Sequence, residues 1–141
     1  MAITSAICSS FKQQILVEGH NLTNGADSIK LALYTSSATL GAGTTVFVTT
    51  GQASGTNYSS GGAALTNVTP ALSGTTAVCD FADLTFGTAT VTARGCLLYN
   101  TANGNKALCA IDFGGDKTST AGDFTVVFPA ADASNAIIRL A

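Results

Sequence analysis

Few side chains in this sequence are of the types that perform acid–base or nucleophilic chemistry. Its 141 residues include one histidine, eight acidic residues and six basic residues. A histidine that acts as a base needs a nucleophile beside it and an acid to orient it, and the sequence places no such pair around His20. The Gly-x-Ser-x-Gly nucleophile motif is also absent from the sequence. We therefore expect that the chain is not an enzyme, and we assign it no catalytic residue.

The single histidine falls near the end of the only convincing helix pattern, which runs from about residue 10 to residue 20. A helix C-terminus carries a partial negative charge that favours a protonated imidazole. We interpret His20 as a capping group or a solvent-exposed side chain.

Two pairs of aspartates lie close together in the sequence. Asp80 and Asp83 form one pair, and Asp112 and Asp116 form the other in a Gly-rich segment. A calcium ion takes about six to eight oxygen ligands, but the second pair lacks Asp-x-Asp-x-Asp spacing and has Lys117 beside it. We interpret this segment as a turn stabilised by aspartate side chains, and we expect no metal and no cofactor.

The cysteines stand at positions 8, 79, 96 and 109, and none of them forms a Cys-x-x-Cys motif. A structural zinc site is therefore not indicated. If Cys96 and Cys109 face one another across a hairpin, a disulfide between them is conceivable. The alternative is that all four cysteines are small buried residues of a protein kept in a reducing compartment.

The composition points to contacts with other proteins. Only 10% of the residues are charged and the net charge is −2, whereas an ordinary soluble domain has about 25% charged residues. The basic residues are scattered, so nucleic-acid binding is not indicated, and no apolar run approaches the ~20 residues of a membrane span. The N-terminus lacks the pattern of a secretory signal, so we expect synthesis in a reducing cytoplasm. A charge-poor surface repels copies of itself weakly, which suits a protein inside an assembly.

The apolar pattern predicts one helix followed by many short strands. Phe11, Ile15 and Leu16 share a helical face. Alternation predicts a strand over 28–35, and a clear inward face at Ala89, Val91 and Ala93. Further strands are predicted at 44–50, 65–72, 77–86, 88–94, 95–100, 106–113, 124–128 and 136–140, with loops at 51–62 and 114–122 and a hairpin turn at Asn103-Gly104.

These elements predict an all-β fold, an antiparallel β-sandwich or a jelly-roll-like arrangement with one short N-terminal helix. We divide the chain into an N-terminal arm, residues 1–9, and a single β-sandwich domain, residues 10–141. Six residues are candidates for contacts with a neighbour, from the arm, the long loop and the C-terminal tail: Ile3, Ile7, Tyr58, Ile137, Ile138 and Leu140. For two of these regions an alternative stays open, since Tyr58 could fasten its loop to the body and the tail could be the last core strand.

Three segments of the chain resemble small virion proteins of tailed bacteriophages. They are the strand–Gly turn–strand–Pro pattern of residues 106–129, the helix SFKQQIL at residues 10–16 and the strand KLALYT at residues 30–35. The likeness covers most of the chain, from about Phe11 to Leu140. It implies a head decoration (cement) protein, or a component of a tail or fibre. Decoration proteins of this size are commonly β-rich trimers seated where capsomers meet, and no catalytic residue is carried over from the family.

We expect a capsid decoration protein that binds the major capsid protein and copies of itself, as a trimer on the capsid surface of the virion. A tail or fibre component is one alternative. Another is a carbohydrate-binding β-sandwich, in which Tyr58 and Tyr99, each beside an asparagine (Asn57 and Asn100), would contact the sugar.

Overall fold

One long hairpin organises the fold. The computed structural model describes residues 2–141, and in it β7 (Leu84–Asn100) and β8 (Lys106–Val126) pair along most of their length. The turn between them falls where Asn-Gly was expected, and Gly104 and Asn105 both have positive φ. Such left-handed residues match the twist of the strands that they join.

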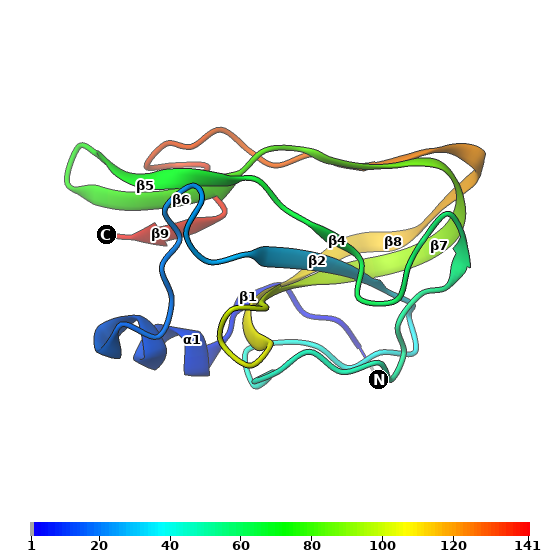
Figure 1. Ribbon diagram of the computed structural model, residues 1–141, viewed down its shortest axis with the longest axis horizontal. Coiled ribbons are helices and arrows are strands. Elements are labelled where there is room, and N and C mark those ends of the chain that lie inside the picture. The colour runs from blue at the N-terminus through cyan, green and yellow to red at the C-terminus, as the bar shows by residue number, and fades with distance from the viewer. Residues whose placement is uncertain (1) are drawn as a thin grey trace.

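The hairpin belongs to the larger of two antiparallel sheets (Figure 1). The strand order of this sheet is β1-β8-β7-β2-β4, and β3 also pairs with β7. The smaller sheet has the order β5-β6-β9. The bounds of these strands are Ala6–Ile7 for β1, Ile29–Tyr34 for β2, Gly55–Thr56 for β3, Ala63–Ala64 for β4, Asn67–Ser73 for β5, Thr76–Phe81 for β6 and Ile138–Leu140 for β9.

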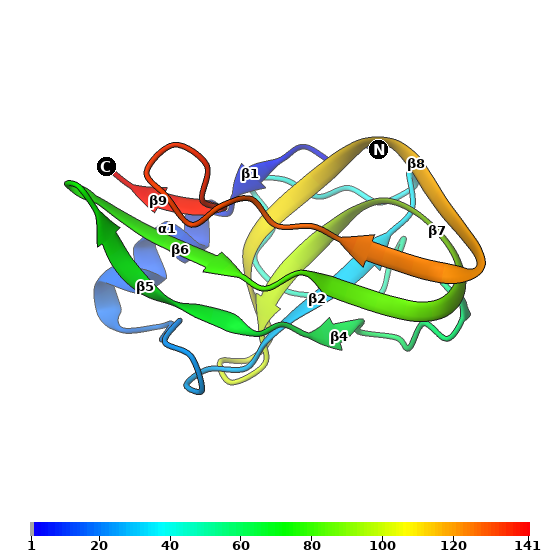
Figure 2. The ribbon, with the colours of Figure 1, turned by 90° about the horizontal axis from the view of Figure 1, so that it is seen from above.

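The hairpin bends sharply, and this bend produces the second layer. The pairing register shifts between Phe86 and Ala89, and Thr88 and Ala121 adopt positive φ on the two strands at this point. Figure 2 shows β8 curling round so that its last part runs back over its first part. The returning part of the hairpin continues towards the smaller sheet (Figure 1). The result is a sandwich-like all-β fold, as predicted.

The core lies between these layers and follows the predicted alternation on β7. Ala89, Val91 and Ala93 are almost fully buried. On β2 both faces are buried apart from the half-buried Lys30, because the segment after β2 packs against it. The Tyr34 hydroxyl donates a hydrogen bond to the carbonyl oxygen of Val48 at 2.5 Å, and Ala53 N–H donates to the carbonyl oxygen of Leu33 at 2.9 Å.

The N-terminal helix is shorter than predicted. The α-helix α1 covers Ser9–Gln14 and continues as a 3-10 turn, η1, over Ile15–Val17. It stops because Glu18 turns into the left-handed region at φ 58° and Gly19 N–H then donates a hydrogen bond to the carbonyl oxygen of Gln14. No helix formed by residues 2–141 has the length and apolar character needed to cross a membrane.

Other predicted boundaries are also wrong. The strand predicted at 77–86 is divided between β6 and β7, and the strands predicted at 88–94 and 95–100 are both part of β7. Residues 44–50 form no named strand and contribute only an isolated bridge between Val46 and Lys106. Residues 114–122 are part of β8 and not a loop, since β7 pairs with Lys117–Ser119 and with Gly122; residues 113–116 lie at a shift of register. The predicted arm is packed on the body: β1 pairs with β8, and Ile3 forms a parallel bridge with Leu40. The first residue of that arm lies outside the described residues.

Candidate functional site

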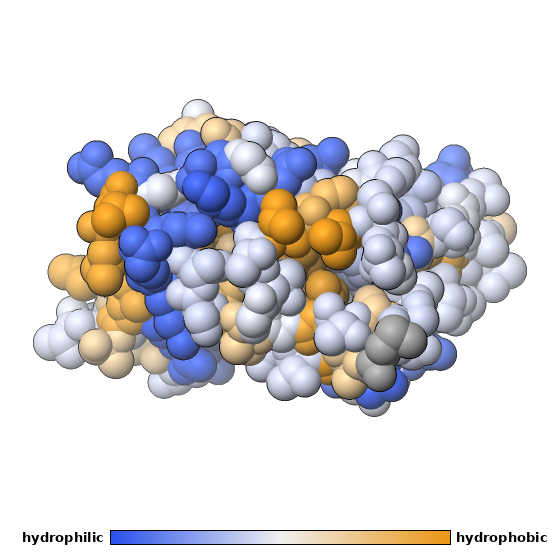
Figure 3. All heavy atoms as spheres, turned by 90° about the horizontal axis from the view of Figure 1, so that it is seen from below, coloured by the Kyte–Doolittle hydropathy of each residue, from blue (hydrophilic) through white to orange (hydrophobic). Residues whose placement is uncertain are grey.

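The surface feature that stands out is a set of exposed apolar side chains around the helix and the smaller sheet. Leu16 and Val17 of η1 are 83% and 64% exposed, Leu72 of β5 is 75% exposed and Leu140 of β9 is 53% exposed. The elements that carry them lie at the same end of the molecule (Figure 1). We call these four residues the apolar end. Figure 3 shows hydrophobic side chains gathered at this end beside a band of hydrophilic ones.

A groove runs between the helix and the smaller sheet at the apolar end. Its volume is about 620 Å³. The helix side contributes Phe11 and Ile15, and the sheet side contributes Val78, Ile138 and Leu140. An open apolar groove of this kind, continuous with exposed Leu and Val side chains, is typical of a surface that a partner covers.

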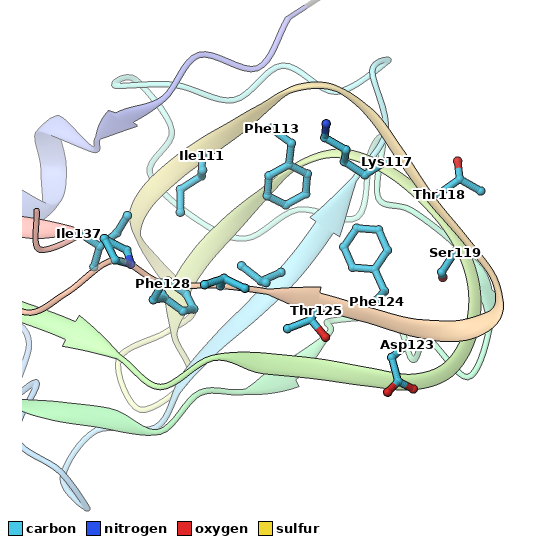
Figure 4. Close-up of a pocket in the computed structure, with 13 residues that line it drawn as sticks. Ile111, Phe113, Lys117, Thr118, Ser119, Asp123, Phe124, Thr125, Phe128 and Ile137 are labelled. Atoms are coloured by element: carbon cyan, nitrogen blue, oxygen red, sulfur yellow. The ribbon is translucent and has the colours of Figure 1, made fainter.

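A second groove of about 540 Å³ lies where β8 curls back on itself. In Figure 4 the rings of Phe113 and Phe124 lie on facing parts of the curled strand, and their centroids are 6.3 Å apart. The groove is also lined by Lys117 and Asp123. The Asp123 carboxylate accepts a hydrogen bond from Thr88 N–H at 3.1 Å, so this side chain stabilises the bend of the hairpin.

Of the residues predicted to contact a neighbour, some are buried inside the chain and others are exposed. Ile3 and Ile138 are buried in the chain itself, and Ile7 is half-buried on β1. Ile137 is half-buried and lines the second groove, whereas Leu140 is exposed and belongs to the apolar end. Ile138 thus acts as part of the last core strand, which is the alternative interpretation of the tail.

The two tyrosines proposed for sugar binding are both buried. Tyr58 is 8% exposed and Tyr99 is 3% exposed. The Tyr58 hydroxyl lies against Leu33 and so fastens the 51–62 loop to the body. The Tyr99 hydroxyl donates a hydrogen bond to the carbonyl oxygen of Gly61 at 2.6 Å. Neither ring is available on the surface as a stacking platform, so that prediction is wrong for these two residues.

Sequence reasoning missed the most exposed residues of the apolar end. Leu16 was expected on the buried face of a helix that runs to His20, but the helix ends early and the 3-10 turn points Leu16 outward. Leu72 lies in β5, an edge strand that contains Pro70. A large apolar side chain on an edge strand was the available signal, since such edges are usually protected by charge.

His20 does not cap the helix. Its surroundings favour the neutral ring, whereas a helix end was expected to favour the protonated ring. The ring is half-buried, and its centroid lies 4.9 Å from that of Phe11. Burial lowers the pKa of His20 from 6.5, and Lys106 lowers this pKa further, while Asp27 opposes the shift. Desolvation therefore outweighs any helix-end effect, because α1 stops six residues before His20.

All four cysteines are buried free thiols. The hairpin register pairs Cys96 with Ile111 and Cys109 with Leu98, so the two cysteines are not opposite one another. The conceivable disulfide is thus not formed. Burial raises the pKa of all four thiols, to about 11 for Cys8 and about 12 for Cys79.

The aspartates do not assemble into a cluster. Asp112 accepts a hydrogen bond from Arg94 Nε at 2.9 Å, and this contact holds the pKa of the carboxyl below its usual value. Asp112 lies within β8, but its Oδ1 atom also accepts a hydrogen bond from Gly114 N–H at 3.0 Å, so the side chain stabilises a local backbone turn as predicted. Asp80 is 1% exposed, and its Oδ2 atom has no hydrogen-bond partner among residues 2–141. Within the same residues, no group of three or more His, Cys, Asp or Glu side chains is placed to hold a metal ion.

Comparisons with models of protein families, with curated proteins and with solved structures found no match to this chain.

Proposed function

We propose that the chain is a structural protein of a virion, a decoration protein that attaches to the capsid through its apolar end. The observation that carries this proposal is that exposed Leu16, Val17, Leu72 and Leu140 lie at the same end of the molecule as a groove that Leu140 lines. These residues come from three separate elements, so the pattern of a single amphipathic segment does not explain why they are exposed together. Exposed apolar side chains that gather on one part of a surface often mark a contact surface.

The outer face of the hairpin supports the same proposal. Thr85 and Thr125 face each other across β7 and β8 with their Oγ1 atoms 2.9 Å apart, and Thr92 and Thr118 do the same at 2.9 Å. Threonine pairs stabilise neighbouring strands without adding charge. A surface built from uncharged hydroxyl groups suits permanent contacts, because charged residues are depleted from the cores of interfaces.

The partners in this proposal are the major capsid protein and two further copies of the chain, which form a trimer with it. A position in the tail or a fibre uses the same apolar end against a different neighbour. The two locations differ in copy number, since a shell protein is present in many copies for each particle and a tail protein in few. Quantitative mass spectrometry of purified virions distinguishes them, and absence of the chain from the virion contradicts both.

The carbohydrate-binding alternative has weaker support. Its two tyrosines are buried, and the second groove offers the rings of Phe113 and Phe124 but uses its aspartate to stabilise the hairpin bend.

Substitution of Leu72 tests the attachment surface directly. Burying one leucine side chain contributes about 1.5–3 kcal/mol, so we expect Leu72→Thr to weaken binding to undecorated capsids by about tenfold to a hundredfold. The matched control is Val127→Thr, because Val127 is 71% exposed but lies in the second groove. Loss of binding with Val127→Thr and not with Leu72→Thr assigns attachment to the other groove and contradicts the proposed surface.

A further inference from the structure

His20 is held between two hydrogen-bonding side chains from different parts of the fold. Its Nε2 atom lies 2.7 Å from Oε1 of Gln14, the last residue of α1. Its Nδ1 atom lies 3.0 Å from Nδ2 of Asn100, the last residue of β7. The imidazole thus bridges the helix and the hairpin turn. We call Gln14, His20, Asp27 and Asn100 the His20 cluster.

The orientation of the Asn100 amide is fixed by its other partners. Asn100 is fully buried, and its Nδ2 atom also donates to Oδ2 of Asp27 at 2.7 Å. Its Oδ1 atom accepts from Ala102 N–H at 2.9 Å. A carboxylate accepts hydrogen bonds only, so a flipped amide would set two oxygens against each other at Asp27 and two donors against each other at Ala102.

This orientation decides the protonation state of the ring. Because Asn100 presents an N–H to it, Nδ1 of His20 must be an acceptor and carries no proton. The ring proton is then on Nε2, which donates to Gln14. A second proton can bind only at Nδ1, where it would meet the Asn100 N–H group. Only the neutral Nε2–H form satisfies every member of the His20 cluster.

The cluster also organises the segment that follows the helix. Oδ2 of Asp27 accepts a second hydrogen bond from Asn21 N–H at 2.9 Å. The side-chain amide of Asn103, in the hairpin turn, donates to the carbonyl oxygen of Gly19. These contacts attach the chain on both sides of His20 to the end of the hairpin. His20 itself lines the groove of the apolar end, as do Phe11 and Ile15.

We propose that His20 is a pH-sensitive latch, which holds the α1–η1 segment (Ser9–Val17) against the β7–β8 turn while it is neutral and releases this segment when it is protonated. Release removes Phe11 and Ile15 from one side of the groove, so acid changes the shape of the apolar end. This inference goes beyond the proposed function and does not depend on what the groove binds.

The charges around His20 set the direction of the pH dependence. Burial and Lys106 of β8 lower its pKa, Asp27 acts in the opposite direction, and Phe11, Gln14 and Asn100 contribute no charge. The released ring has the ordinary pKa of 6.5, so the released state binds more protons than the held state. The latch is therefore intact above about pH 6.5, and each lower pH unit favours release by up to about tenfold until the pKa of the held ring is reached.

The single histidine allows a direct test by NMR. Long-range ¹H–¹⁵N spectra of the full chain at pH 8 report the tautomer, and a titration reports the pKa. We expect the Nε2–H tautomer, a pKa below 6.5, and hydrogen exchange in residues 10–17 that becomes up to about tenfold faster for each pH unit below 6.5. Exchange is corrected for its intrinsic pH dependence and compared with that of β2. A proton on Nδ1, a pKa at or above 6.5, or acid-insensitive exchange in residues 10–17 overturns the proposal.

Substitutions at Gln14 separate the latch from a general acid effect. In Gln14→Glu the new carboxylate still accepts from Nε2 and favours the charged ring, so we expect the pKa of His20 to rise and the pH dependence of exchange to shrink. Gln14→Met removes the acceptor without adding charge and is the matched control. An unchanged pKa of His20 in Gln14→Glu contradicts the assigned geometry, and so does an equal rise in both variants.

Discussion

The hydroxyl oxygen of Tyr58 accepts a hydrogen bond from the backbone N–H of Leu33 at 2.8 Å. The same hydroxyl lies 3.1 Å from Oε1 of Gln52, to which it can donate its proton. One phenol group therefore closes the 51–62 loop over β2. This explains why a segment with little strand or helix preference has a defined position.

Removing this hydroxyl destabilises the fold. In Tyr58→Phe the ring still packs against Phe86, but Leu33 N–H is left buried without its partner. An unsatisfied buried donor costs about 1–3 kcal/mol, and we expect the free energy of unfolding in urea to fall by this amount. Thr92→Val is the control, because it removes a hydroxyl from an exposed pair. Equal stability of Tyr58→Phe and the wild type contradicts the assigned role.

Gly62 supports the same loop by a close backbone approach. A Cβ atom on this residue would lie 1.7 Å from the carbonyl oxygen of Leu31, and its φ is +77°. We expect Gly62→Ala to lower the free energy of unfolding by about 3 kcal/mol or more, because overpacking against rigid backbone adds to the cost of a left-handed residue.

Gly74 provides the matched control for this substitution. Its φ is +64°, but a Cβ atom there would have no neighbour within 4 Å. Gly74→Ala therefore measures the conformational cost alone, about 1 kcal/mol. If thermal or urea denaturation gives both variants the same stability, the close approach at Gly62 is not a constraint on the fold.

Period-two alternation was sufficient to predict the buried face of β7 and the class of the fold. Ala89, Val91 and Ala93 point into the core as their spacing indicated. The turn at Asn103-Gly104 was equally predictable, because Asn and Gly favour hairpin turns; the two residues with positive φ are Gly104 and Asn105.

The second half of β8 could not be predicted in this way. Residues 114–122 are rich in Gly, Ser and Thr, which favour loops when considered alone. They form a strand because β7 lies alongside with free backbone groups, and this pairing is a property of the fold and not of the segment. The bend at Thr88 and Ala121 could not be predicted from the sequence either, since neither residue type favours positive φ.

The candidate site was only partly predictable for a related reason. Composition identified a charge-poor surface but not which apolar residues it exposes. Leu140 was identified because it lies in an apolar C-terminal tail, whereas the exposure of Leu16 depended on where the helix ends. That end is set by the backbone turn at Glu18 and by contacts of Gly19 with Gln14, which no helical periodicity reveals.

The four thiols are expected to be unreactive in the folded protein. The thiolate is the nucleophile, and burial raises the pKa of Cys8 to about 11 and that of Cys79 to about 12. Cys96 and Cys109 are shifted in the same direction. Iodoacetamide at pH 8 should leave the native chain unmodified and label all four cysteines in strong denaturant, as measured by intact mass. Rapid labelling of any one cysteine in the native chain contradicts its burial.

Asp80 is expected to make the fold less stable as the pH rises. Burial raises the pKa of this carboxyl above 3.8 and Asp83 adds to the shift, although the backbone N–H groups of Phe81 and Ile137 oppose it. The folded state therefore binds the proton more tightly than the unfolded state. No penalty exists well below pH 3.8. The penalty grows as the pH passes from 3.8 to the higher folded pKa, and it is complete above that pKa.

Asp80→Asn tests this linkage because the amide is isosteric and uncharged. Its oxygen can still accept from Phe81 N–H, while the buried ionised group with an unpartnered oxygen is gone. We expect the variant to be more stable than the wild type in urea at pH 7 and nearly equal to it at pH 3.5. Asp83→Asn is the control, because Asp83 accepts from Phe128 N–H at 2.8 Å through one oxygen and should not gain stability at pH 7. A loss of stability in Asp80→Asn at pH 7 would mean that the charged form of Asp80 is stabilised in the fold, contrary to the burial argument.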